Sequence, residues 1–243
     1  MIIFRTIRNI LAVSWLIIAG SFGSILLLIG KLFGDQGKWG MLWIKYVFIP
    51  PALWILGARV TTTGLDNLDS KKSYVFASNH ESHLDTPAIY WQSPRILYFI
   101  AKAELRKAPI IGWFISLSGM LFVDRKNSTK AKESLQQAAD MIRNGKNIIS
   151  FPEGSRTKTG EIGQFKKGLF ALAIQAKTDV IPVTIHGARE VWPSGTYKTN
   201  SGKILIHFGE PVPHTKFETD PIGFSKEVRE IVIAQKAKLA LKG

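Results

Sequence analysis

A histidine and an aspartate lie five residues apart in the segment that runs from Ser78 to Asp85. A histidine held by a carboxylate can take a proton from an alcohol near neutral pH. The pair His80 and Asp85 therefore has the residue types of a general base and its orienting group. In one continuous helix the two side chains would lie about 140° apart around the axis. The chemistry therefore requires a turn between them.

The flanking residues predict such a turn. Tyr74–Ala77 has the pattern of a buried strand, and Asp85-Thr86-Pro87 has the pattern of a helix start. Asp85 also has a structural interpretation as the N-cap of that helix, worth about 1 kcal/mol. The two roles are compatible, because a capping carboxylate can still face His80.

A metal site is the alternative for this segment. His80, His83 and Asp85 are plausible ligand types, but their spacing matches no familiar zinc motif. Glu81 and His83 also have the simpler interpretation of side chains that only face solvent.

A polar loop after a second predicted strand has the composition of a phosphate-binding site. Glu153 opens it, Gly154 lets a ligand approach the backbone, Ser155 offers a hydroxyl, and Arg156 offers a bidentate guanidinium. A solvated surface turn is the alternative. The position at a strand end favours anion binding, as do three further cations, Lys158, Lys166 and Lys167.

Two more cations follow predicted strands. Arg125 follows the strand Met120–Asp124, and Lys102 follows the strand that ends at Ala101. Each could bind a phosphate or form an ordinary exposed ion pair, which is worth little. Because ligands collect at the carboxyl ends of parallel strands, we expect Arg125, His80 and Glu153 to converge on one sheet edge.

Alternating apolar runs and helical patterns predict an α/β domain with a largely parallel sheet flanked by helices over residues 59–243. The expected strands are Arg59–Thr63, Ser73–Ser78, Ile96–Ala101, Met120–Asp124, Asn147–Phe151, Val180–His186 and Lys203–Phe208. The expected helices are Asp85–Gln92, Pro109–Leu117, Ser128–Asn144, Lys167–Lys177 and Pro221–Leu241.

Residues 1–58 are predicted to form a separate membrane-docking segment of two helices. Ile10 to Gly30 is a run of 21 uncharged residues, about the length that crosses a bilayer. The second apolar run, Tyr46 to Ala58, is too short to span alone. We favour a helical hairpin that enters one leaflet and returns. A single spanning helix and a cleaved signal peptide are the alternatives.

Composition narrows the function further. The chain has no cysteine, which excludes disulfides, thiolate metal sites and cysteine nucleophiles. The net charge of +14 indicates an anionic partner such as a membrane surface or a phosphorylated substrate. Neither a serine nucleophile elbow nor a glycine-rich nucleotide loop occurs. The long apolar run argues against a nucleic-acid binder.

Taken together, four blocks of the chain resemble the glycerolipid acyltransferases, specifically the 1-acylglycerol-3-phosphate acyltransferases. The blocks are Asn79-His80-x4-Asp85, Gly119-x-x-Phe122-Val123-x-Arg125, Phe151-Pro152-Glu153-Gly154-Ser155-Arg156 and Val180-Ile181-Pro182-Val183. They occur in the family's order and cover roughly residues 60 to 210. Ser155 stands where the family more often has threonine, which keeps the hydroxyl.

The resemblance implies transfer of an acyl group from acyl carrier protein or acyl-coenzyme A to lysophosphatidic acid, giving phosphatidic acid. No cofactor is implied beyond that thioester co-substrate, and no nucleic acid or metal. His80 would be the general base, oriented by Asp85. The acceptor would be bound by Lys102, Arg125, Glu153, Gly154, Ser155 and Arg156. The implied location is the cytoplasmic face of the bacterial inner membrane.

Two other functions remain open from the sequence. One is a sibling acyltransferase that uses glycerol 3-phosphate or another lysophospholipid. The other is a catalytically silent, membrane-docked lipid-binding protein, which the intact His80 and Asp85 pair argues against.

Overall fold

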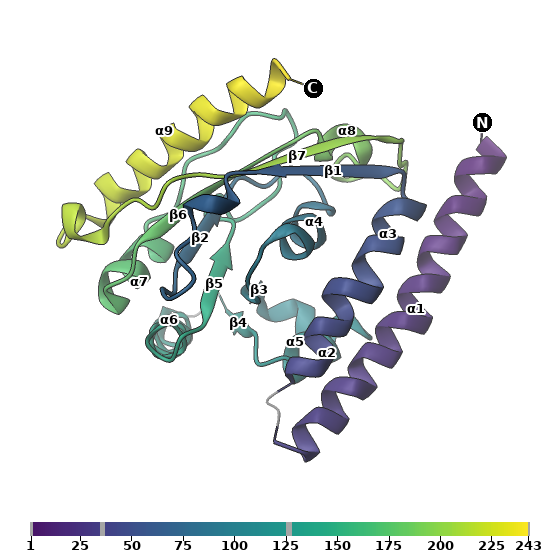
Figure 1. Ribbon diagram of the computed structural model, residues 1–243, viewed down its shortest axis with the longest axis horizontal. Coiled ribbons are helices and arrows are strands. Elements are labelled where there is room, and N and C mark those ends of the chain that lie inside the picture. The colour runs from purple at the N-terminus through teal and green to yellow at the C-terminus, as the bar shows by residue number, and fades with distance from the viewer. Residues whose placement is uncertain (1, 35–36, 125–127, 243) are drawn as a thin grey trace.

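A seven-stranded sheet forms the centre of the molecule (Figure 1). The computed structural model describes residues 2–34, 37–124 and 128–242. The strand order is β1-β7-β6-β2-β5-β3-β4. The strands are β1 (Ala58–Thr63), β2 (Val75–Ser78), β3 (Leu97–Lys102), β4 (Leu121–Val123), β5 (Asn147–Ser150), β6 (Val180–His186) and β7 (Gly202–Phe208).

All neighbouring strands are parallel except β6 and β7. Strands β2 to β6 therefore end at one common edge, whereas β1 and β7 run in the opposite direction. The expectation of a largely parallel sheet flanked by helices is confirmed. The predicted strands and helices agree with the observed ones to within two residues at each end.

Helices cover both faces of the sheet (Figure 1). One face packs against α4 and the N-terminal helices, the other against α6, α7 and α9. Alternation along β2 sets these faces, because Phe76 packs into one core and its neighbours Val75 and Ala77 into the other. The helices are α4 (Asp85–Gln92), α5 (Ile111–Leu117), α6 (Ser128–Arg143), α7 (Gly168–Ala176), α8 (Ala188–Val191) and α9 (Pro221–Ala240), of which the short α8 was not predicted.

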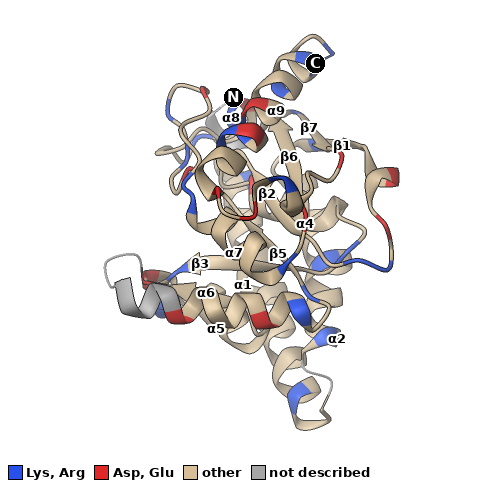
Figure 2. Cartoon of the chain, turned by 90° about the vertical axis from the view of Figure 1, so that its left-hand side faces the viewer, with Lys and Arg blue, Asp and Glu red and all other residues tan. Residues whose placement is uncertain are grey.

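The described residues between Ile2 and Ile55 form a helical hairpin. Helix α1 (Ile2–Leu32) packs against a returning arm that consists of α2 (Lys38–Trp43), a π-helical turn η1 (Ile44–Phe48) and α3 (Ile49–Ile55). The arm leads directly into β1. No Asp or Glu occurs in these four elements, and the end of the molecule near α2 is tan and blue in Figure 2. The boundary of 58 residues between two separate domains stays a prediction.

The segment Thr6–Leu32 is long and apolar enough to cross a membrane, by length and composition alone. Much of its apolar surface faces outward, including Ile10, Leu11, Ile17, Ile18, Ile25 and Leu28. Its start is fixed to the α/β domain, because the buried Arg8 donates hydrogen bonds to Thr199 Oγ1 at 2.6 Å and Ser201 Oγ at 3.3 Å. Leu32 lies about 36 Å further along the helix.

Candidate active site

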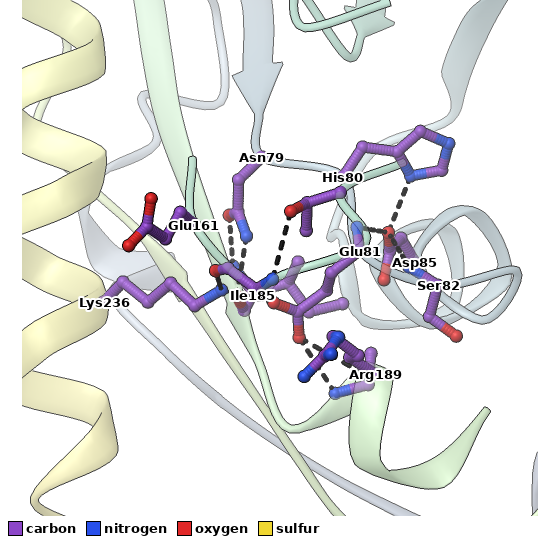
Figure 3. Close-up of polar contacts among 12 residues, drawn as sticks. Asn79, His80, Glu81, Ser82, Asp85, Glu161, Ile185, Arg189 and Lys236 are labelled. Carbon is purple, nitrogen blue, oxygen red and sulfur yellow. Dashed lines mark hydrogen bonds and ion pairs between the residues drawn. The ribbon is translucent and has the colours of Figure 1, made fainter. Parts of the chain in front are cut away.

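The turn that connects β2 to α4 joins His80 to Asp85 (Figure 3). His80 Nδ1 lies 2.6 Å from Asp85 Oδ2. The same oxygen accepts the backbone N–H groups of Glu81 at 2.6 Å and Ser82 at 2.8 Å. Asp85 is fully buried and the His80 side chain is 19% exposed. One carboxylate oxygen therefore closes the turn and fixes the imidazole through Nδ1.

The capping interpretation of Asp85 is wrong. The N-cap of α4 is Leu84, and Asp85 is the first helical residue. Its carboxylate bonds to N–H groups that precede the helix rather than to those of the first helical turn. An aspartate at a helix start can bond in either direction. Here the turn before the helix contributes the donors.

Two contacts position the turn on the sheet. The Asn79 side chain bonds both backbone groups of Ile185, donating to its oxygen and accepting from its nitrogen, each at 2.9 Å. The ring of His80 stacks on Phe151 at the end of β5, with centroids 4.0 Å apart. The imidazole is thus held between an ion partner and an aromatic surface.

The segment 151–163, which we call the acceptor loop, is bonded to the backbone of His80 on both sides. Glu153 Oε1 accepts from His80 N at 2.7 Å, and Thr157 N donates to His80 O at 2.8 Å. The second oxygen of Glu153 accepts from Gly163 N at 2.8 Å. Burial raises the pKa of Glu153, and the two backbone donors act in the opposite sense.

Two features of the acceptor loop are the backbone conformation of Gly154 and the side-chain contact of Arg156. Gly154 has φ +80°, a left-handed conformation that favours glycine. The guanidinium of Arg156 contacts Nδ1 of His83, whose ring packs against Trp192. Burial and the charge of Arg156 lower the pKa of His83, so His83 is a neutral acceptor for that guanidinium near pH 7. Ser155 is exposed on the same loop.

Lys102 and Arg125 are the two remaining residues that the sequence suggested for binding a phosphate. Lys102 is exposed at the end of β3, which pairs with β5 and ends at the same sheet edge. Arg125 lies outside the described residues. The structure therefore brings together His80, Asp85, Glu153 and Arg156 and places Lys102 at their edge.

Glu81 does not face solvent, contrary to the simpler interpretation of the sequence. Its side chain is 2% exposed, and it pairs with Lys236 of α9. Burial raises the pKa of Glu81 to about 7, although Lys236 acts in the opposite sense. Reasoning from the sequence missed Lys236, because it lies 155 residues downstream on a helix face that resembles an ordinary charged surface.

The three residues considered as metal ligands are not arranged as a ligand set. His80 and Asp85 contact each other, whereas His83 contacts Arg156. Across residues 2–34, 37–124 and 128–242, no three or more His, Asp or Glu side chains gather in a way that could hold a metal ion.

The fold and the site define an α/β protein in which a partly exposed histidine contacts a buried aspartate at the edge of a mostly parallel sheet. The sequence model described as "Acyltransferase" matches residues 59–186, a range that includes both members of the pair and the acceptor loop. The chain belongs to this acyltransferase family.

Named relatives and a solved structure are also similar. The 1-acyl-sn-glycerol-3-phosphate acyltransferase of Saccharomyces cerevisiae is 30% identical over 93% of this chain and 76% of its own length. The chloroplastic enzyme of that name from Arabidopsis thaliana is 31% identical, and the match spans about half of its length (45%). The crystal structure of the 1-acyl-sn-glycerophosphate acyltransferase from Thermotoga maritima superposes with a TM-score of 0.81 at 28% identity, covering 97% of this chain and 98% of that one.

Proposed function

We propose that the protein transfers an acyl group from a thioester to the sn-2 hydroxyl of 1-acylglycerol 3-phosphate, giving phosphatidic acid. The contact between His80 and Asp85 beside the acceptor loop is the observation that carries this proposal. The names of the yeast, Arabidopsis and Thermotoga relatives support the same acceptor.

In the proposed reaction, His80 Nε2 takes the proton of the sn-2 hydroxyl as its oxygen attacks the thioester carbonyl carbon. The new C–O ester bond forms and the C–S bond breaks. The imidazolium then returns the proton to the leaving thiolate, so the histidine is unchanged after one turnover. Asp85 keeps Nδ1 protonated and the ring oriented, as in other histidine–carboxylate pairs.

The acceptor phosphate fits the basic side chains at this edge. Arg156 offers a planar fork, and its contact with neutral His83 holds it beside the turn of residues 79–85, which we call the reactive turn. Lys102 and Arg125 are proposed to add charge, and Gly154 and Ser155 a backbone approach and a hydroxyl. The carboxylate of Glu153 would act through the backbone, because both its oxygens accept N–H groups.

The hairpin is proposed to bind the membrane in which lysophosphatidic acid and phosphatidic acid reside. Both of its ends adjoin the α/β domain, at Arg8 and at the start of β1, which favours entry and return on one side of the bilayer. The cytoplasmic face of a bacterial inner membrane is the corresponding location. The donor would be acyl carrier protein or acyl-coenzyme A, with no further cofactor.

Turnover of the detergent-solubilised protein tests the proposal. The panel pairs acyl-coenzyme A and acyl carrier protein thioesters with lysophosphatidic acid, glycerol 3-phosphate and lysophosphatidylcholine. We expect transfer to lysophosphatidic acid that persists with a chelator, and loss of transfer but not of lysolipid binding in His80→Ala. Transfer by His80→Ala would remove the general-base role, and preference for another acceptor would identify a sibling enzyme.

A further inference from the structure

The side chain of Glu81 is buried although it belongs to the reactive turn. Its backbone N–H donates to Asp85 Oδ2, while its carboxylate extends to the other side of the turn (Figure 3). Oε1 accepts the first N–H groups of α8, from Ala188 at 3.1 Å and Arg189 at 3.4 Å. Oε2 contacts the ammonium group of Lys236.

Lys236 extends this contact to the acceptor loop. Its Nζ also donates to the carbonyl oxygen of Gly160 at 2.9 Å, and its side chain is 17% exposed. Helix α9, which carries Lys236, packs on β6 and α7 and buries Phe224, Val228 and Val232 in the core. One ammonium on a firmly packed helix thus contacts both the reactive turn and the loop that carries Arg156.

The charges make this arrangement sensitive to the loss of either partner. Without Lys236 the buried carboxyl of Glu81 either keeps an uncompensated charge or takes up a proton, and in both cases it loses the contact that fixes its position. A displaced Glu81 would move the two backbone N–H groups that hold Asp85 Oδ2. Loss of the hydrogen bond to Gly160 would also release the part of the acceptor loop that does not contact His80.

We propose that Lys236 is a positioning residue for acyl transfer, holding the turn of His80 and Asp85 in register with the acceptor loop through Glu81 and Gly160. This role rests on the proposed function. It assigns a task in catalysis to the C-terminal helix, which lies beyond the residues matched by the family model.

The test compares Lys236→Met with Lys238→Met, which removes an exposed lysine two residues away on the same helix. Small displacements of reacting groups are costly, so we expect kcat of Lys236→Met to fall roughly ten- to a hundredfold. KM for lysophosphatidic acid should rise several-fold. Lys238→Met should stay within about twofold of wild type on both measures. Assays well below the melting temperature separate positioning from a general loss of folded protein.

Coupling to Glu81 is measured by a double-mutant cycle. In the Glu81→Gln background Lys236 no longer pairs with a carboxylate and keeps its bond to Gly160, so Lys236→Met should there lower kcat by clearly less than it does in the wild-type background. Hydrogen exchange gives a readout independent of turnover. Amides of residues 80–85 and 157–163 should exchange faster in Lys236→Met, and those of the sheet strands should not.

Wild-type kcat and exchange in folded Lys236→Met would overturn the proposal, as would an equal effect of Lys236→Met in both backgrounds. If Lys236→Met does not fold, kcat and hydrogen exchange of the single variant Glu81→Gln test the proposal instead. Faster exchange in both segments with a lower kcat supports the proposal, and wild-type values overturn it. Failure of the proposed function is distinguishable, because it would appear as no transfer by wild type or as transfer by His80→Ala.

Discussion

At the scale of single residues, one oxygen atom of Asp85 performs two tasks. It accepts from His80 Nδ1 and from the backbone of Glu81 and Ser82. The first contact orients the imidazole, and the other two close the turn that makes the contact geometrically feasible. The residue that orients the histidine is therefore also the residue that folds its loop.

Asp85→Asn should separate these tasks. The amide oxygen can still accept the two backbone N–H groups, so the free energy of unfolding should fall by less than about 2 kcal/mol. The amide cannot supply the charge that stabilises an imidazolium, so kcat should fall about 100-fold or more. Steady-state kinetics and denaturant unfolding measure the two effects.

Asp179→Asn is the matched control. Asp179 Oδ1 contacts His214 Nδ1 at 2.9 Å before the start of β6, at the opposite edge of the sheet. Its turnover should stay close to wild type. Near-normal kcat in a well-folded Asp85→Asn protein would contradict the assigned role of Asp85.

Glu81 predicts a pH dependence of stability. Its pKa in the folded protein is about 7, above the ordinary value of 4.5, because the carboxyl group is buried. Between these values the folded state keeps a proton that the unfolded chain has lost. The free energy of unfolding should therefore fall as pH rises from 4.5 to 7, by at most about 1.4 kcal/mol per pH unit.

Glu81→Gln should lack this contribution. Thermal unfolding at several pH values between 4.5 and 7.5 measures the stability of wild type and variant. The contributions of the histidines are the same in both proteins, so they cancel in the difference. Parallel stability curves for the two proteins would show that Glu81 has no raised pKa.

At the scale of elements, the hairpin depends on a close crossing of α1 and α2. A Cβ atom added to Gly40 would lie 2.3 Å from Leu27 Cγ and 3.0 Å from the backbone oxygen of Gly23. Two glycines, one on each helix, thus allow the backbones to approach. Helix association inside lipid depends on such small residues, because apolar side chains have no solvent to escape there.

Gly40→Leu should force α1 and α2 apart. Overpacking of a close contact costs typically about 1–3 kcal/mol, so the variant should unfold at a lower temperature in detergent. Val47→Leu adds bulk to an exposed position on the same arm and should leave the transition unchanged. Equal transitions in both variants would show that the crossing tolerates a larger separation.

Much of this arrangement follows from local sequence patterns. Apolar runs such as Val180–His186 predict strands, and the parallel order brings His80 and Glu153 to one edge, as observed. The direction of the Asp85 carboxylate could not be predicted, since donors are available on both sides of it. The contact between Glu81 and Lys236 depends on how α9 packs, which no local pattern specifies.

At the scale of the whole molecule, two features favour binding to a membrane, the positive charge and the exposed apolar surface. The net charge of +14 attracts anionic headgroups, and the outward apolar face of α1 offers burial in lipid. Acidic and basic side chains are mixed over the α/β domain, whereas the four helical elements of the hairpin carry basic side chains and no Asp or Glu (Figure 2). The electrostatic part should respond to salt and the apolar part should not.

Vesicle co-sedimentation can separate the electrostatic contribution to membrane binding from the apolar contribution. Raising the salt concentration from about 0.1 M to 1 M shortens the Debye length from about 10 Å to about 3 Å. Binding to vesicles with anionic lipid should weaken but persist, and binding to neutral vesicles should stay nearly constant. Complete release from anionic vesicles at 1 M salt would contradict insertion of the hairpin.

The reversal of β7 relative to β6 has a kinetic consequence. It brings the start of β7, beside the residues that bind Arg8, to the edge at which β6 ends and the reactive turn lies. If the hairpin inserts as proposed, catalysis takes place close to the plane of the bilayer. The search for a lysolipid is then two-dimensional, so the rate should depend on the mole fraction of that lipid in the surface rather than on its bulk concentration.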